Sequence, residues 1–95
     1  MYILKNALLE IAINAIGAEL KSVKHQQYDI EYMWQANPQF WGRTSPVLFP
    51  IVGRLTDNTT LINGQAYEIM QHGFARDCAF ECVAQTDDKI SFRLM

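Results

Sequence analysis

The stretch Leu61-Ile62-Asn63-Gly64-Gln65-Ala66-Tyr67 carries the clearest fold signal in this chain of 95 residues. Asn63 and Gly64 both tolerate a positive φ angle, which the two central residues of a tight hairpin turn require. The residues on either side are mostly apolar or strand-forming, as is typical of paired strands. This stretch therefore predicts a β-hairpin centred on Asn63 and Gly64.

A period-two alternation of apolar and polar residues continues on both sides of this hairpin. It predicts strands at residues 9–13, 18–24 and 30–34, and a second hairpin over 80–94 with its turn at 86–89. Residues 7–18 also allow an alanine-rich helix, but their β-branched isoleucines favour a strand. Short strands joined by turn signals predict an all-β fold, an antiparallel β-sandwich.

Prolines interrupt the middle of the chain. Asn37-Pro38 ends the third predicted strand, and residues 38–44 are expected to form a short helical turn. The apolar run 46–50 begins and ends with proline, so it does not fit a central strand. We expect a buried, irregular segment that carries Arg54 toward a cleft.

The last predicted strand, at residues 90–94, has no closing turn after it. We therefore expect residues 1–95 to form one incomplete β-sandwich domain that belongs to a larger sandwich. Such a domain leaves strand edges and an apolar sheet face uncovered. Self-association by strand addition or domain swapping is the expected consequence.

Composition argues against several classes of protein. The formal net charge of −2 leaves no basic face for nucleic acid. No apolar run approaches the length of about 18 residues that spans a bilayer, and the amino terminus does not resemble a secretory signal, so a cytoplasmic location is expected. Cys78 and Cys82 form neither a zinc motif nor a disulfide framework, and are expected to be reduced thiols on one face of a strand.

Two arginines and one histidine surround the predicted hairpin: Arg54, His72 and Arg76. Arginine presents a planar fork of donors and histidine a ring donor, and both suit the hydroxyls of a sugar. A solvated or purely structural role is the competing interpretation for each residue. The other histidine, His25, lies in a polar stretch that is expected to be a strand end or turn, and its side chain is expected to be solvated.

The order of the motifs at residues 17–23, 31–35, 40–54 and 71–77 resembles the aldose 1-epimerase family, also called galactose mutarotase-like proteins, and most closely its bacterial LacX-type branch. The resemblance implies a large twisted β-sandwich, of which this chain supplies the first third or so. It also implies interconversion of the α and β anomers of an aldose by general acid–base catalysis. No metal or organic cofactor is implied.

The same resemblance assigns the sugar contacts. Arg54 matches the family arginine that precedes the Gly64-x-x-Tyr67 strand, and His72 matches the histidine of the family's His-Gly step. The catalytic histidine, aspartate and glutamate base of the family lie downstream of these motifs, so none is assigned among residues 1–95. The chain alone is expected to bind sugar without turning it over.

Two further arginines leave alternatives open. Arg43 and Arg76 resemble arginines that a hexose-6-phosphate epimerase branch directs at phosphate, a task that suits the bidentate guanidinium. The alternative for Arg76 is a structural ion pair with Asp77 or with a neighbouring acidic residue. Trp34 and Trp41 are either a sugar-stacking platform or core aromatics. For the whole chain, the competing hypothesis is a non-catalytic carbohydrate-binding or structural β module.

Overall fold

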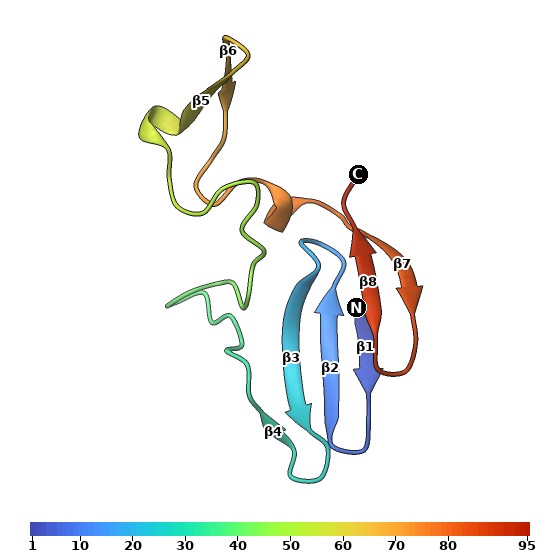
Figure 1. Ribbon diagram of the computed structural model, residues 1–95. Coiled ribbons are helices and arrows are strands. Elements are labelled where there is room, and N and C mark those ends of the chain that lie inside the picture. The colour runs from blue at the N-terminus through green and yellow to red at the C-terminus, as the bar shows by residue number, and fades with distance from the viewer.

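The computed structural model describes all 95 residues, and its strands are all antiparallel (Figure 1). One sheet has four strands in chain order, and two separate hairpins follow. The strands are β1 (Tyr2–Lys5), β2 (Leu9–Asn14), β3 (Glu19–His25), β4 (Ile30–Glu31), β5 (Thr59–Ile62), β6 (Gln65–Glu68), β7 (Glu81–Gln85) and β8 (Ile90–Arg93). Two 3-10 turns, η1 (Thr56–Asn58) and η2 (Ala75–Asp77), complete the structure. The predicted all-β, antiparallel class is confirmed.

Local signals account for most of the four-stranded sheet. The Asn6 side chain accepts hydrogen bonds from the backbone N–H groups of Leu8 and Leu9, both at 2.8 Å, and so closes the turn between β1 and β2. β2 pairs with β3 along its whole length, with one bulge at Ala12 and Ile13. The alternation at residues 9–13 is therefore a strand and not a helix. β1 was not predicted because its first three residues are all apolar and show no alternation.

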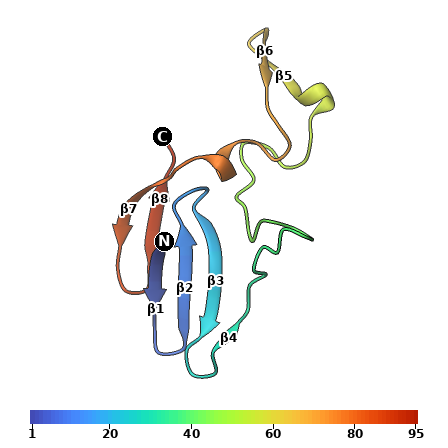
Figure 2. The ribbon, with the colours of Figure 1, turned by 180° about the vertical axis from the view of Figure 1, so that it is seen from behind.

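The hairpin of β7 and β8 confirms the prediction over 80–94 and lies against the first strand. The rings of Tyr2 in β1 and Phe92 in β8 meet edge to face, with centroids 5.2 Å apart. The backbone N–H of Lys5 donates to the carbonyl of Asp87 at 3.1 Å. β1 and β8 accordingly overlap in both opposite views (Figures 1 and 2). This contact joins the two ends of the chain.

The hairpin of β5 and β6 projects away from the rest of the molecule (Figure 1). Asn63 and Gly64 occupy its turn with φ angles of 51° and 78°, the left-handed values that the sequence predicts. Every residue of β6 is exposed. The hairpin is thus formed by its own turn and ladder and receives little support from packing.

Of the expectations for the middle of the chain, one is confirmed and two are wrong in part. The short helical turn expected within residues 38–44 is present as a single turn, in which the backbone N–H groups of Phe40 and Trp41 donate to the Asn37 carbonyl at 3.0 and 2.9 Å. The strand expected at 30–34 is paired only at 30 and 31, because the Glu31 carboxylate takes the Met33 N–H at 3.1 Å and turns the chain. The segment 46–50 is irregular as expected, but it is not buried, since Val47 and Phe49 are 40% and 55% exposed.

Few side chains are buried in this fold. Leu4 and Ala75 are the only buried apolar ones. Trp34 and Trp41 are about half exposed, so the core interpretation of these aromatics is wrong. Both cysteines are free, but Cys78 precedes β7 instead of lying on it, and the expected shared strand face does not exist. No helix is long and apolar enough to cross a bilayer.

Candidate functional site

The predicted site residues lie in the loop 71–77 or in segments that form hydrogen bonds with it. Gly73 pairs with Phe49 in an isolated parallel bridge, and the N–H groups of Phe74 and Ala75 donate to the Phe49 carbonyl at 3.0 and 3.2 Å. A side chain at Gly73 would place its Cβ 2.1 Å from that carbonyl oxygen, and Gly73 has a φ angle of 75°. Only glycine fits this close approach.

The far end of this loop is held by the connection between β2 and β3. Gly17 donates its N–H to the Cys78 carbonyl at 2.7 Å, and Phe80 donates to the Ala15 carbonyl at 2.9 Å. A Cβ on Gly17 would lie 2.7 Å from the carbonyl oxygen of Arg76. The loop is therefore clamped on one side by the segment around Phe49 and on the other by the sheet.

His72 makes a reciprocal pair of hydrogen bonds with Gly53. Its backbone N–H donates to the Gly53 carbonyl at 2.8 Å, while its ring Nδ1 accepts the Gly53 N–H at 2.9 Å. Because Nδ1 is an acceptor, the neutral ring carries its proton on Nε2. The Gln71 amide nitrogen lies 3.5 Å from that Nε2 atom, but both are donors in this tautomer, so Gln71 does not accept the Nε2 proton. The ring is thus fixed in orientation and tautomer, with one donor left to present.

Arg54 follows Gly53 directly, so the same pair of hydrogen bonds brings it beside His72 along the backbone. Its side chain is exposed and donates from Nε to the Asn58 carboxamide oxygen at 3.3 Å. Both terminal nitrogens of the guanidinium are unused by the chain. The structure therefore brings Arg54 and His72 into one neighbourhood, although no hydrogen bond joins the two side chains.

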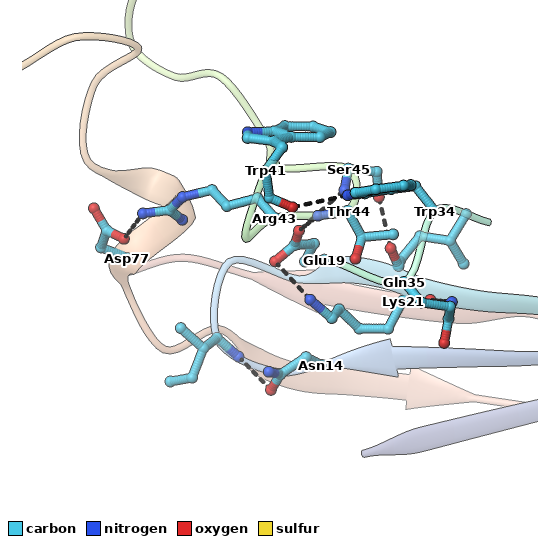
Figure 3. Close-up of polar contacts among 12 residues, drawn as sticks. Asn14, Glu19, Lys21, Trp34, Gln35, Trp41, Arg43, Thr44, Ser45 and Asp77 are labelled. Atoms are coloured by element: carbon cyan, nitrogen blue, oxygen red, sulfur yellow. Dashed lines mark hydrogen bonds and ion pairs between the residues drawn. The ribbon is translucent and has the colours of Figure 1, made fainter. Parts of the chain in front are cut away.

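The other two candidate arginines are engaged in contacts within the chain. Arg76 donates from Nη2 to the Gln71 carbonyl at 3.0 Å, which closes the loop 71–77 on itself. Arg43 forms an ion pair with Asp77, with Nη2 2.8 Å from Oδ1 (Figure 3). The expected pair between Arg76 and Asp77 is therefore wrong, because Arg43 reaches that carboxylate instead.

Arg43 also governs the protonation of Asp77. Its hydrogen bond, and then its positive charge, lower the pKa of the Asp77 carboxyl below the ordinary value, with partial burial opposing the shift. Asp77 is the acidic residue of the loop 71–77. Since it is held ionised by a salt bridge, it is poorly suited to carry a proton near neutral pH.

Glu19 is a site residue that the sequence analysis missed. Its carboxylate is 7% exposed and accepts the backbone N–H groups of Thr44 and Ser45 at 2.8 and 3.0 Å (Figure 3). Lys21 lies 3.7 Å from the second oxygen. Burial raises the pKa of Glu19, but the hydrogen bonds from Thr44 and Ser45, together with the positive charges of Lys21 and Arg43, leave the net pKa below its ordinary value. In the sequence, Glu19 is one polar residue in the alternating pattern of a predicted strand. That pattern gives no indication that its carboxylate is buried.

The Glu19 carboxylate acts as an anchor. It fixes residues 44 and 45 on the end of β3, and the hydroxyl of Ser45 adds a hydrogen bond to the Leu20 carbonyl at 2.7 Å. Arg43 then extends from this anchored segment to the loop 71–77 (Figure 3). Glu19 thus positions Arg43, which in turn binds Asp77. No hydrogen bond or ion pair connects Glu19 to Arg54 or His72.

The remaining candidates lie outside this cluster. Trp34 donates its indole N–H to the Trp41 carbonyl at 2.8 Å, which fixes one ring but leaves both indoles half exposed (Figure 3). His25 ends β3, where its Nδ1 accepts the N–H groups of Gln27 and Tyr28 at 3.2 Å each. His25 is therefore a turn-forming residue and not a freely solvated one.

Comparison with solved structures identifies the class of fold. The chain superposes on a galactose mutarotase related enzyme from Lactobacillus acidophilus with a TM-score of 0.95 and 47% identity, covering 98% of this chain and 31% of that chain. A galactose mutarotase-like protein from Lactobacillus casei gives 0.92 and 33%, covering 97% and 31%. The four-stranded sheet and the two hairpins described above are thus part of a galactose mutarotase-like fold.

Sequence comparison then identifies the family. The aldose 1-epimerase family pattern matches residues 1–95, and the chain therefore belongs to the aldose 1-epimerase family. The plasmid-encoded protein LacX of Lactococcus lactis is 31% identical over 96 aligned positions, which cover 96% of this chain and 32% of LacX. The chain spans about a third of the length of the curated relatives it matches.

Proposed function

We propose that residues 1–95 provide the sugar-contacting part of an aldose 1-epimerase, in which Arg54 and His72 bind the hydroxyl groups of an aldose. The observation that carries this proposal is the reciprocal hydrogen bonding of Gly53 and His72. It presents the ring Nε2 of His72 as a donor and holds Arg54 immediately beside it. Donors of this kind match the closely spaced oxygens of a sugar.

The reaction proposed for the whole protein is the interconversion of α and β anomers. A base removes the proton of the anomeric hydroxyl, an acid protonates the ring oxygen, and the opened sugar recloses after rotation. Within this chain, Arg54 and His72 hold and polarise the substrate. Asp77 is committed to Arg43, so the proton-transfer pair is assigned to no residue between 1 and 95.

An unphosphorylated aldose is the preferred substrate class. A phosphate would need free guanidinium groups from Arg43 and Arg76. One terminal nitrogen, Nη2, is held within the chain in each of them, by Asp77 for Arg43 and by the Gln71 carbonyl for Arg76, whereas both terminal nitrogens of Arg54 are unused. These contacts support a structural role for both residues, and sugar phosphate is the second candidate ligand.

Saturation-transfer NMR on the 95-residue chain with D-galactose tests this proposal. We expect a weak but specific signal, and Arg54→Ala and His72→Asn should each lower the affinity about tenfold or more, because loss of one hydrogen bond to a charged group costs about 1.5–3 kcal/mol. Asparagine is chosen at position 72 because it tolerates the φ angle of 64° found there.

Two matched variants serve as controls. Arg93→Ala removes an exposed arginine that is paired with Glu81 in the hairpin of β7 and β8. His25→Asn changes the histidine at the end of β3, which has no contact with Arg54 or His72. Both should retain the galactose signal. Equal binding by all four variants would refute the assignment of Arg54 and His72. A stronger signal with galactose 6-phosphate that depends on Arg76 would favour the phosphate-directed alternative.

A further inference from the structure

Two consecutive residues in the turn after Arg54 have a left-handed backbone. Asp57 and Asn58 both have a φ angle of 55°, inside η1. Aspartate and asparagine tolerate this conformation better than other residues with a side chain, but it still strains the backbone. Strain of this kind is concentrated at functional sites. The contacts of Asn58 show what the turn achieves here.

The turn folds the chain back so that Asn58 meets Arg54, four positions earlier. The Asn58 N–H donates to the Leu55 carbonyl at 3.0 Å, and the Asn58 carbonyl accepts the N–H of Ile69, just after β6, at 2.8 Å. The backbone of Asn58 is thus held from both sides. Its half-buried side chain then accepts a hydrogen bond through Oδ1 from Nε of Arg54 at 3.3 Å. The position of this acceptor is therefore fixed by the fold.

The engaged atom distinguishes Arg54 from the other arginines of the chain. Arg43, Arg76 and Arg93 each form their contact within the chain through Nη2. Arg54 is held through Nε instead. An occupied Nη2 removes one of the two donors at the end of the guanidinium, whereas an occupied Nε leaves Nη1 and Nη2 side by side and free. Arg54 is accordingly the arginine whose terminal, bidentate edge is intact.

We propose that Asn58 is a positioning residue, which holds the guanidinium of Arg54 so that its two terminal nitrogens bind two adjacent hydroxyl groups of the aldose. The inference rests on the proposed sugar-binding role of Arg54, and adds the residue that orients the side chain and the edge that meets the ligand. A free arginine side chain loses rotational freedom when it binds, and one that is already oriented loses less. Asn58 acts through Arg54 and needs no contact with the sugar.

Asn58→Gly tests this role, because glycine accepts the left-handed backbone while the side-chain acceptor is removed. Titration with D-galactose, followed by saturation-transfer NMR, should give an affinity about three- to tenfold lower than that of the wild-type chain, the effect of one lost hydrogen bond. Asn58→Asp keeps an acceptor at the same place and should bind galactose within about twofold of the wild-type chain. Wild-type affinity in Asn58→Gly would overturn the proposal.

Asn63→Gly is the matched control. Asn63 is another left-handed asparagine, with a φ angle of 51°, in the turn between β5 and β6, and its side chain has no hydrogen bond to Arg54. This variant should retain the wild-type affinity for galactose, and circular dichroism reports whether each variant is folded. Equal losses in Asn58→Gly and Asn63→Gly would contradict the proposal, because a general effect of glycine on the hairpin would then explain both.

A second measurement needs neither sugar nor a folded variant. In a nitrogen–proton correlation spectrum of the wild-type chain, the Nε–H of Arg54 should exchange with water more slowly than that of Arg93, an exposed arginine that pairs through Nη2. Asn58→Gly should remove this difference, and Asn58→Asp should retain it. Equal exchange of the two Nε–H groups in the wild-type chain would refute the positioning role of Asn58.

The two measurements separate failure of this inference from failure of the proposed function. If Arg54→Ala lowers the galactose affinity and Asn58→Gly does not, the sugar-binding role of Arg54 stands and the role of Asn58 is refuted. If Asn58→Gly changes the exchange of the Arg54 Nε–H while Arg54→Ala leaves galactose binding intact, the proposed function fails, and the bidentate sugar contact fails with it.

Discussion

Gly73 shows how a single residue positions the candidate site. Its left-handed backbone lets the loop 71–77 approach Phe49 so closely that a Cβ atom would lie 2.1 Å from the carbonyl oxygen. We expect Gly73→Ala to lower the free energy of unfolding by about 3 kcal/mol or more, through combined backbone strain and steric clash. Urea denaturation followed by circular dichroism measures the loss.

Gly64→Ala is the matched control for this variant. Gly64 has a similar φ angle of 78°, but nothing lies within 4 Å of its Cβ position. The Gly64→Ala substitution should lower the free energy of unfolding only by the strain of a left-handed non-glycine residue, roughly 1–2 kcal/mol. Equal losses at the two positions would show that the approach to Phe49 is not what requires glycine at position 73.

Glu19 leads to a prediction about pH. Its pKa is lower in the folded chain than the ordinary 4.5, so its ionised form stabilises the fold above about pH 4.5. This contribution is lost as the pH falls through the folded pKa. The pKa values of Glu31 and Asp77 are also lowered. At Glu31 burial raises the pKa, but the hydrogen bonds from Ser22, Met33 and Val23 and the charge of Lys24 together lower it. At Asp77 the hydrogen bond from Arg43 is the largest cause, so both carboxylates contribute to stability in the same acidic pH range.

We therefore expect the melting temperature to fall between pH 5 and pH 3, and to fall less in Glu19→Gln, whose side-chain oxygen can still accept the two backbone donors. Thermal denaturation at several pH values measures this difference. Glu68→Gln, in the exposed strand β6, is the control and should follow the wild-type curve. An unchanged pH dependence in Glu19→Gln would contradict the anchoring role of Glu19.

Among the elements, the hairpin of β5 and β6 is the most independent. Seven of its eight strand residues are exposed, and it projects from the molecule (Figure 1). An isolated two-stranded hairpin is only marginally stable in water. We expect its amide protons to exchange with solvent faster than those of β2 and β3, which pair over six positions. Hydrogen-exchange NMR measures the contrast, and equal protection would indicate support that this structure does not contain.

For the whole molecule, the exposed apolar groove, whose lining includes Val47, Phe49 and Phe74, leads us to propose that the chain self-associates. Light scattering at micromolar concentration should reveal dimers or larger assemblies, because water disfavours the exposed apolar area. Val47→Asp should shift the population toward monomer, since it charges the same groove. A stable monomer that unfolds cooperatively would contradict this expectation.

Local features of the sequence determined the all-β class, both hairpins and the strands around residues 9–13 and 18–24. Asn63-Gly64 fixes a turn by the φ angles it allows, and alternation reports which residues share a sheet face. These signals act between residues close in the chain. They failed at residues 30–34, where the Glu31 side chain redirects the backbone after two paired residues.

Only the tertiary structure decided how the candidate residues are connected. Gly53 and His72 are 19 positions apart, and Arg43 and Asp77 are 34 apart. Composition and periodicity carry no information on such pairings, because a long-range contact depends on where the intervening elements place each backbone. For that reason the sequence identified Arg54 and His72 as candidates, while the orientation of the His72 ring, the partner of Asp77 and the burial of Glu19 became visible only in the folded chain.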